Sequence, residues 1–236
     1  MQAASLWTVL RRRWRDTRAL KSPIATSLEI AADLWEFAKE STPERRRALF
    51  GDMEYDWEHD SNTTSGGVTH RTRLLAILSG APYQPTEPGL FHEMLRALSI
   101  DFAQFILVDL GSGKGRTLLM AAGFPFKRVI GVELFPELHE VAVENIAKSE
   151  HRARLETLCL DARDYQFPSD PLVLYLFNPL SAAALEKVIS NLRDSLQQHP
   201  RIVRVIYHNP LSESVLRDSS FLTLIGGTHQ FSIYSN

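Results

Sequence analysis

Three alternate glycines follow an acidic residue near the middle of the sequence, a pattern suited to binding a ligand through the backbone. Asp109 lies two residues before Gly111, and Gly113 and Gly115 complete the loop. Because glycine has no side chain, such a loop can adopt left-handed backbone angles and lets a ligand approach the amide groups at the start of the following helix. A glycine loop by itself does not identify the ligand, so the residues around it decide the chemistry.

Two further acidic residues end the next two apolar runs. Glu133 follows Gly111 by 22 positions, a spacing at which one carboxylate can hold both hydroxyls of a ribose. Asp161 ends the run after that and is followed by Ala162. Each of the three acids also has a structural explanation. Asp109 can cap the loop before the helix, Glu133 can be an acid in the first turn of a helix, and Asp161 can form a turn. We expect all three acids to converge, because they follow consecutive strands whose carboxyl ends form the ligand-binding edge of such sheets.

The elements that must position these residues are predicted from the hydrophobic pattern after Ile100. Apolar runs bounded by turn residues alternate with stretches of helical spacing, which is typical of parallel strands buried on both faces. The predicted strands cover 105–110, 128–132, 155–160, 172–177, 202–207, 221–225 and 230–234, with helices over 116–122, 136–148 and 181–198. The last two strands, joined by Gly226 and Gly227, can close the sheet in antiparallel fashion. We therefore expect an α/β fold with a doubly wound, mostly parallel, seven-stranded sheet.

The spacing of the glycine loop separates two families that share these features. A dinucleotide-binding loop has the form G-x-G-x-x-G, whereas this sequence has G-x-G-x-G, with Asp109 before it and Asp161 after the third strand. Taken together, the motifs make residues from about 83 to 235 resemble a class I, seven-stranded, Rossmann-like S-adenosylmethionine-dependent methyltransferase. The resemblance implies S-adenosylmethionine as the cofactor and implies no metal ion.

The same resemblance implies a role for each residue of the loop and the strand ends. Asp109 and the three glycines would hold the methionine end of the cofactor, and Glu133 would hold the ribose. Leu134 would pack on the adenine, whose edge would be read by Asp161 and the backbone amide of Ala162. The chemistry of the cofactor agrees, because its cationic end, its diol and its flat base each need a different partner.

The methyl acceptor is expected beside the end of the fourth strand, where Asn178 and Pro179 stand. This pair resembles the N/D-P-P-aromatic motif of amino-methyltransferases, in which the Asn side chain and a proline carbonyl accept hydrogen bonds from the target amine. Leu180 replaces the second proline, and Ser181 replaces the aromatic residue that would stack on a flipped base, which argues against nucleobase methylation. The alternative is that Asn-Pro simply ends the strand and leads into a helix.

Two other positions are candidates for the same rim. His208 ends the fifth strand and can serve as a general base near neutral pH, or else it is a surface or capping residue. Tyr83 and Thr86, in Tyr83-x-Pro-Thr86, resemble the loop that covers the methionine end of the cofactor in non-SET protein-lysine methyltransferases of the Dot type. Otherwise Thr86 is the N-cap of a helix that begins at Glu87.

The first 82 residues are expected to form a helical extension that caps a methyltransferase domain spanning 83–236. Apolar residues at helical spacing predict a helix from Ile24 onward, and Pro43 opens a second, short one. Alternating acids between Asp52 and Asp60 predict an extended connection, whose charge would steer a basic peptide to the rim. Residues 1–28 carry six basic side chains against one acidic, which fits a solvated amphipathic helix or an organellar transit peptide.

Composition excludes several classes of protein and leaves others open. The 236 residues include 26 basic and 28 acidic side chains and one cysteine, so there is no evident nucleic-acid surface, disulfide scaffold or cysteine-rich zinc site. The longest uncharged run is shorter than the roughly 20 residues of a membrane span. We expect a cytoplasmic enzyme that transfers a methyl group by in-line displacement to an amine, with a protein lysine ahead of a small metabolite. A small-molecule N- or O-methyltransferase, a nicotinamide-dependent oxidoreductase and a non-catalytic interaction module are the alternatives.

Overall fold

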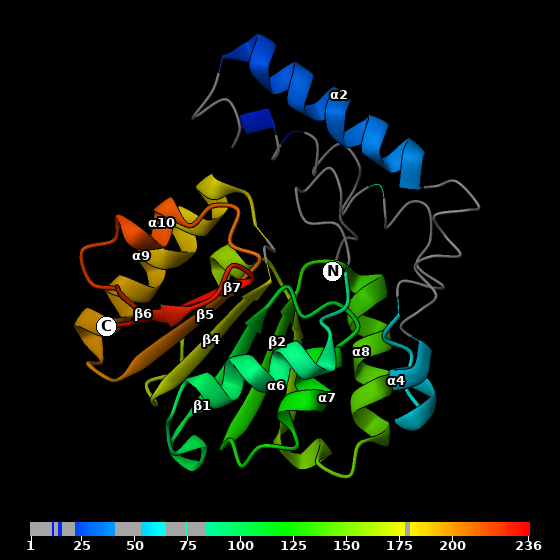
Figure 1. Cartoon of the computed structure of the whole chain (residues 1–236), viewed down its shortest axis with the longest axis vertical. Helices are drawn as coiled ribbons and strands as arrows, with labels where there is room; N and C mark the ends of the chain where they lie inside the picture. Colours follow the sequence, from blue (N-terminus) through cyan, green and yellow to red (C-terminus); the bar gives the residue numbers. More distant parts are fainter. Residues whose placement is uncertain are drawn as a thin grey trace.

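A seven-stranded sheet organises the part of the chain described by the structure, a computed structural model of residues 11, 14–15, 22–40, 53–64, 74, 84–177 and 180–236. The strand order is β3-β2-β1-β4-β5-β7-β6 (Figure 1). The strands are β1 (Ile106–Leu110), β2 (Arg128–Glu133), β3 (Leu155–Cys159), β4 (Leu172–Phe177), β5 (Val203–His208), β6 (Thr223–Gly227) and β7 (Phe231–Ser235). The first five are parallel, and β7 is antiparallel to both its neighbours. The predicted doubly wound, mostly parallel sheet is confirmed.

The helices of the domain begin where their sequences favour a start. Pro88 and Pro136 occupy first-turn positions of α6 and α8, where the missing backbone N–H would have had no helical partner. The Glu87 carboxylate caps α6 by accepting hydrogen bonds from the amides of Gly89 and Leu90. The helices are α2 (Pro23–Glu40), α4 (Met53–Glu58), α6 (Pro88–Ala97), α7 (Arg116–Ala121), α8 (Pro136–Lys148), α9 (Ala182–Gln198) and α10 (Ser214–Arg217), with 3-10 turns η2 (Phe102–Gln104), η3 (Arg152–Arg154) and η4 (Ala162–Asp164).

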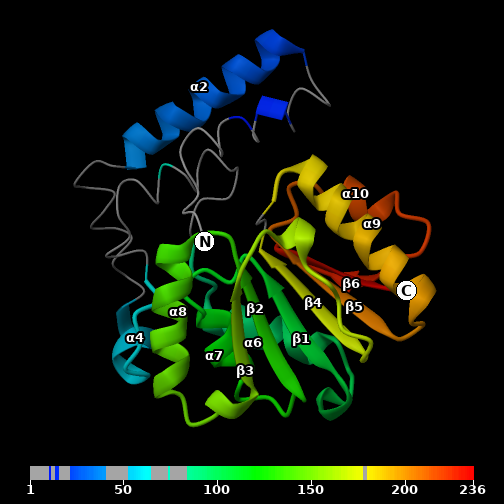
Figure 2. The ribbon, with the colours of Figure 1, turned by 180° about the vertical axis from the view of Figure 1, so that it is seen from behind.

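The strand order reverses beside β1, which lies between β2 and β4. In register, Asp109 is opposite Gly131 on β2 and Tyr175 on β4. Helices that leave neighbouring strands on either side of such a switch point cover opposite faces, so a crevice opens at the carboxyl ends of the strands. The ribbon shows these ends pointing toward the upper part of the molecule in both views (Figures 1 and 2).

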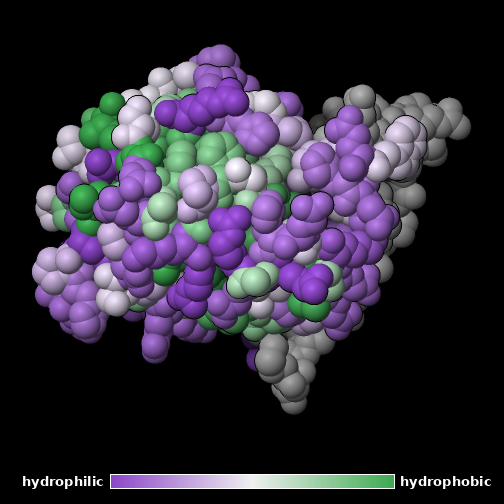
Figure 3. Space-filling view, turned by 90° about the horizontal axis from the view of Figure 1, so that it is seen from below, coloured by the Kyte–Doolittle hydropathy of each residue, from purple (hydrophilic) through white to green (hydrophobic). Residues whose placement is uncertain are grey.

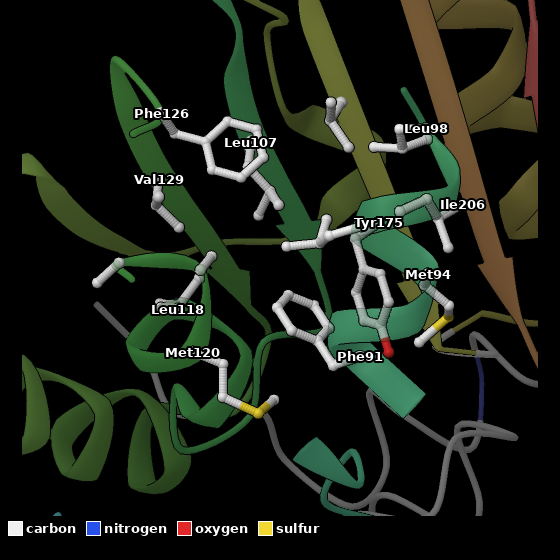
Figure 4. Close-up of a cluster of buried hydrophobic side chains, with 14 of the residues drawn as sticks. Phe91, Met94, Leu98, Leu107, Leu118, Met120, Phe126, Val129, Tyr175 and Ile206 are labelled. Atoms are coloured by element: carbon white, nitrogen blue, oxygen red, sulfur yellow. The ribbon is translucent and has the colours of Figure 1, made fainter. Parts of the chain in front are cut away.

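Each face of the sheet has its own hydrophobic core. On one face, α6 and α7 contribute Phe91, Met94 and Leu118, and Figure 4 shows the ring of Tyr175 between the first two of these side chains. On the other face, α9 and α10 cover the sheet with Leu185, Val188, Ile189, Leu192 and Leu216. Burial on both faces explains why β4 is a continuous apolar run, and why β1 is apolar except at Asp109, rather than alternating.

Gly131 lets α7 and the glycine loop pack directly on β2. A Cβ atom at this position would lie 2.6 Å from Leu118 Cδ1 and 2.6 Å from Ser112 Oγ, closer than side chains can approach. The strand therefore needs a residue without a side chain two positions before Glu133. This packing brings the end of β2 against the loop that follows β1.

The end of β6 differs from the prediction. Gly226 and Gly227 belong to the strand rather than to the turn, which covers residues 228–230. Gly227 has φ 145°, and a Cβ atom there would lie 2.4 Å from the Phe231 carbonyl oxygen of β7. Glycine is thus required inside the strand by the close approach of its partner.

The N-terminal part departs further from the prediction. Residues 53–58, expected to be an extended connection, form the helix α4. The helix predicted from Ile24 is present as α2, but Ile24, Leu28 and Trp35 are exposed, so its apolar spacing does not mark a buried face. The helix predicted after Pro43 and most of the basic head lie outside the described residues.

None of the described helices combines the length and the apolar character needed to cross a bilayer. Seen from below, the face away from the carboxyl ends of the parallel strands is largely hydrophilic around one hydrophobic area (Figure 3).

Candidate functional site

A cleft opens at the carboxyl ends of β1, β2 and β4 and brings most of the predicted site residues together. Counted together with the open solvent at its mouth, its empty space is about 900 Å³. The predicted residues that line it are Thr86, Asp109, Gly111, Gly113, Glu133, Leu134, Asp161 and Ala162. Three acids that are far apart in the sequence thus converge on one cavity.

The glycine loop turns sharply, and its first three amides bond to the end of β2. Gly111 and Gly113 have φ 90° and 54°, the left-handed region in which glycine is favoured. The amides of Gly111 and Ser112 both donate to the Val132 carbonyl oxygen, at 2.8 and 3.1 Å, and the Gly113 amide donates to Glu133 Oε2 at 2.8 Å. These amides therefore fasten the loop to the end of β2 instead of facing the cleft.

Gly115 has a packing role that the spacing alone does not indicate. It does not line the cleft but serves as the N-cap residue of α7 at φ 84°. A Cβ atom there would lie 3.3 Å from the Ala142 side chain of α8. The third glycine thus allows α7 and α8 to pack closely beside the site.

Glu133 links the loop, the strand end and the cleft. Its two carboxylate oxygens accept hydrogen bonds from the amides of Gly113 and Phe135, each at 2.8 Å. Burial raises the pKa of this carboxyl to about 7, although the backbone hydrogen bonds act in the opposite direction. Each carboxylate oxygen can accept more than one hydrogen bond, so a diol can still bind to both.

Asp109 is buried beside the same cavity. Its carboxylate accepts a hydrogen bond from the Thr117 hydroxyl of α7. Burial raises its pKa to about 7, Thr117 lowers it, and the nearby charge of Glu133 raises it. Two buried carboxyl groups that repel each other favour a bound cation, which would stabilise their ionised forms.

The third acid combines a structural role with a place in the cleft wall. The Asp161 carboxylate accepts a hydrogen bond from the Arg163 amide at 2.9 Å and pairs with the Arg163 guanidinium at 2.9 Å. The structure therefore confirms Asp161 as a turn-forming residue, and the same residue also lines the cleft. Beside Asp161, the cleft wall is apolar, with Leu134, Leu138 and Leu160 on one side and Ala162 at the start of η4.

The other side of the cleft carries a chain of neutral hydrogen-bonding groups. Thr86 Oγ1 lies 3.0 Å from Tyr175 Oη, which lies 2.9 Å from His208 Nδ1. Thr86 is buried and is not the N-cap of α6, a role that belongs to Glu87. The capping alternative for Thr86 is therefore wrong, and its segment lines the cleft.

His208 differs from both of its predicted descriptions. It is buried rather than on the surface, and its ring stacks on Phe177 with centroids 3.8 Å apart. Burial lowers its pKa to about 4, so at neutral pH the ring is uncharged and a poor general base. The other residues expected on this rim, Tyr83, Asn178 and Pro179, lie outside the described residues.

Three residues of the site were not found by sequence reasoning. Arg116 and Thr117 line the cleft from the first turn of α7, and Tyr175 lines it from the middle of the sheet. Arg116 directly follows Gly115, so its position in the loop was a usable signal. The sequence contained no such signal for Tyr175, because a tyrosine inside an apolar strand is normally interpreted as part of the hydrophobic core.

The cleft fits S-adenosylmethionine by its donor set. Buried carboxyl groups at Asp109 and Glu133 suit a cationic group and a diol, and the leucine-lined wall suits a flat base. Among the described residues, no group of three potential metal ligands occurs. The site therefore matches a sulfonium nucleoside in charge and polarity.

Comparison with known proteins agrees with this reading of the cleft. A family model described as a methyltransferase domain matches residues 107–199, and no curated protein matches the sequence. An RNA methyltransferase from Salinibacter ruber in complex with S-adenosyl-L-homocysteine is 21% identical at a TM-score of 0.44, covering 64% of this chain and 92% of that one. A SAM-dependent methyltransferase from Aquifex aeolicus is 14% identical at a TM-score of 0.48, covering 64% and 98%. A putative RNA methyltransferase from Pyrococcus horikoshii is 18% identical at 0.45, covering 65% and 86%.

The matched segment runs from β1 to the end of α9 and contains all the cleft-lining residues except those at 84–86. It contains the glycine loop and all three converging acids. Residues 107–199 are thus similar to a methyltransferase domain, and they lie within a seven-stranded, Rossmann-like sheet.

Proposed function

We propose that this enzyme transfers the methyl group of S-adenosylmethionine to an amine nitrogen, and that a protein lysine is the first candidate acceptor. The support from sequence is the pair Asn178 and Pro179, which directly follows β4 at the switch point of the sheet. The support from structure is the neutral part of the cleft wall at the end of β4, formed by Thr86, Tyr175 and Phe177. A neutral wall suits an amine, which must be uncharged to attack.

The proposed cofactor contacts follow the chemistry of the cleft. Asp109 would hold the cationic methionine end, with the loop at 111–115 shaping the turn around it. Glu133 would accept hydrogen bonds from the ribose. Leu134 would pack on the adenine, and Asp161 with the Ala162 amide would contact its edge.

The remaining roles concern the mouth of the cleft. Tyr83 and Thr86 would cover the methionine end, an assignment supported by the burial of Thr86 against Tyr175. We place the methyltransferase domain at 83–236 and an N-terminal extension at 1–82. The start of α6 at Pro88 and its packing on the sheet support this boundary.

Catalysis by such a site is mainly a matter of position. When bound, the cofactor supplies an electrophilic methyl group on a sulfonium. The Asn178 carboxamide oxygen and the Pro179 carbonyl oxygen would accept hydrogen bonds from the N–H groups of the amine and align its lone pair behind the methyl carbon. The new N–C bond forms as the C–S bond breaks, its electrons stay on sulfur, and the amine proton leaves to solvent. Since His208 is a poor base, we assign it to holding Tyr175 rather than to removing this proton.

The acceptor can be identified by following the label. Purified enzyme is incubated with methyl-labelled S-adenosylmethionine and fractionated lysate, and label is counted in protein, RNA and small molecules. We expect label in protein, recovered as methyllysine after acid hydrolysis. Label confined to RNA or to small molecules would contradict the lysine assignment, while leaving the cofactor assignment intact.

Asn178→Ala tests the rim directly. We expect turnover to fall by at least about tenfold, since the amine loses an aligning hydrogen bond, while cofactor affinity stays within about twofold. Cofactor affinity is measured by calorimetry and turnover by label transfer. Wild-type turnover in this variant would reduce Asn178 to a residue that ends the strand.

A further inference from the structure

A short N-terminal segment, residues 55–64, is docked on the glycine loop and is used by no step described so far. It comprises the end of α4 and the turn that follows, and we refer to it as the strap. Figures 1 and 2 both show α4 beside α8, next to the loop that follows β1. Its contacts with the loop are polar, buried and made by the two basic residues of the loop itself.

Lys114 is the first of these contacts. Its ammonium group donates to the Asn62 side-chain oxygen at 3.0 Å and to the Thr64 carbonyl oxygen at 2.8 Å. The residue is only 2% exposed. Burial lowers its pKa to about 8, opposed by the charge of Asp56, so the group is still mainly protonated at neutral pH. A cation buried to this degree needs such partners to be tolerated.

Arg116 is the second contact, and it also lines the cleft. Its Nε donates to the Thr63 hydroxyl at 2.6 Å, and its guanidinium lies 4.8 Å from the centroid of the Tyr55 ring. A terminal nitrogen of the same group lies 3.8 Å from the Asp56 carboxylate. One side chain therefore touches both the strap and the cofactor cleft.

Asp56 holds the strap in the shape that makes these contacts. Its carboxylate accepts hydrogen bonds from the Ser61 hydroxyl and from the amides of Thr63 and Thr64, all at 2.8 Å. Burial raises the pKa of this carboxyl, but hydrogen bonds from Thr63, Ser61 and Thr64 outweigh that effect and lower it. The turn that receives Lys114 and Arg116 is thus folded around one ionised side chain.

Asn145 of α8 ties the strap and the loop to the domain. It accepts a hydrogen bond from the Asn62 amide at 2.9 Å and donates one to the Lys114 carbonyl oxygen at 2.9 Å. The residue is buried. Through Asn145, α8 therefore contacts both the strap and the glycine loop, at the residue that follows Gly113.

We propose that Asp56 is a positioning residue for cofactor binding, which acts through the strap to hold Lys114 and Arg116 and so the glycine loop. Without the docked strap, both cations would lose their buried partners, and the loop could not keep this conformation at low cost. Cofactor affinity and strap docking would then be coupled. The inference rests on the cofactor part of the proposed function and not on the identity of the acceptor.

The test uses the full chain and S-adenosylmethionine alone, with a matched control on the strap. In Asp56→Asn we expect the Kd for the cofactor to rise about tenfold, because the amide group cannot accept every hydrogen bond that the carboxylate accepts. Asp60→Asn is the control, since its side chain is 90% exposed and pairs only peripherally with Lys148 of α8. Aspartate and asparagine are both tolerated at the φ of 45° that residue 60 adopts. We expect wild-type affinity in the control.

Hydrogen exchange of the free enzyme separates positioning from general destabilisation. In Asp56→Asn we expect faster exchange of the amides of 111–117, with unchanged exchange in β4 and β5. Thr63→Val is a milder variant that removes only the hydroxyl that accepts a hydrogen bond from Arg116 and donates one to Asp56, and we expect about a threefold rise in Kd. If Asp56→Asn does not fold, the Kd of Thr63→Val decides whether the strap positions the glycine loop.

Two results would overturn the proposal in distinguishable ways. Wild-type Kd and exchange in folded Asp56→Asn or Thr63→Val would show that the strap does not position the loop. Failure of the wild-type enzyme to bind S-adenosylmethionine would overturn the cofactor assignment, and this inference with it.

Discussion

The two halves of the cleft differ in charge. The half built from β1, β2 and the turn after β3 contains the buried carboxyl groups of Asp109 and Glu133. The half built from β4 and residues 84–86 presents neutral groups on its described residues, such as Thr86 and Tyr175. A cationic cofactor and a neutral nucleophile need these opposite surroundings, so we propose that the first half binds the cofactor and the second the acceptor.

The two halves are also supported by different parts of the chain. The loop of the cofactor half is held from outside by the strap, through Lys114 and Arg116. The acceptor half is held from inside the domain, because His208 of β5 supports Tyr175 of β4. A change in one half should therefore leave the other half's function largely intact.

The largest effect is expected from Glu133→Ala, which removes the carboxylate that joins the glycine loop to β2. Cofactor affinity should fall by about 1.5–3 kcal/mol, roughly 10- to 100-fold, the scale of hydrogen bonds to a charged group. Calorimetry with S-adenosylmethionine measures this loss. Glu156→Ala on β3 is the control, since this acid pairs at the surface with Arg128. Unchanged affinity in Glu133→Ala would remove Glu133 from the site.

A second effect is a pH dependence confined to the cofactor half. The carboxyl groups of Asp109 and Glu133 both have a pKa raised to about 7, above the value near 4 of an unfolded chain. The free protein therefore binds more protons than the unfolded chain between these values and loses stability as the pH rises through them. Cofactor binding favours the ionised forms, so its affinity should fall about tenfold from pH 8 to pH 6 if one proton must leave.

Calorimetry in buffers of different ionisation enthalpy measures this linkage. The expected result is proton release on binding near pH 6.5, which disappears above pH 8. Affinity that does not change between pH 6 and pH 8, with no proton released, would mean that neither carboxyl contacts the cofactor.

The smallest effect is expected in the acceptor half. Tyr175→Phe removes the hydroxyl between Thr86 and His208, and turnover should fall about fivefold, on the order of 1 kcal/mol. Cofactor affinity should stay within about twofold of wild type. Tyr165→Phe is the control, a buried tyrosine that does not line the cleft. A loss of cofactor affinity as large as in Glu133→Ala would show that the two halves are not separable.

The sheet was predictable because each of its strands can be recognised from its own short stretch of sequence. Parallel strands buried on both faces are short apolar runs between turn residues, and β4 has the predicted bounds of 172–177. The acids at 109, 133 and 161 were also predictable, since each directly follows or ends such a run. Strand ends at one edge of a sheet converge whatever the details of the loops.

The rest of the site depends on contacts that no local pattern reveals. The strap meets Lys114 and Arg116 across 50 or more positions of sequence, and its alternating acids look like an extended segment. Asp56 is in fact turned inward, so it cannot belong to an acidic surface that steers a peptide. The directions of the loop amides follow from how the loop meets Val132, which spacing alone does not specify.

The most direct measurement of the central claim is a calorimetric titration of the wild-type enzyme with S-adenosylmethionine, S-adenosylhomocysteine and a nicotinamide dinucleotide at pH 8. The cleft formed by the glycine loop and the acids at 109, 133 and 161 predicts one binding site for each of the two sulfur nucleosides and none for the dinucleotide. Binding of the dinucleotide without binding of either sulfur compound would contradict the account.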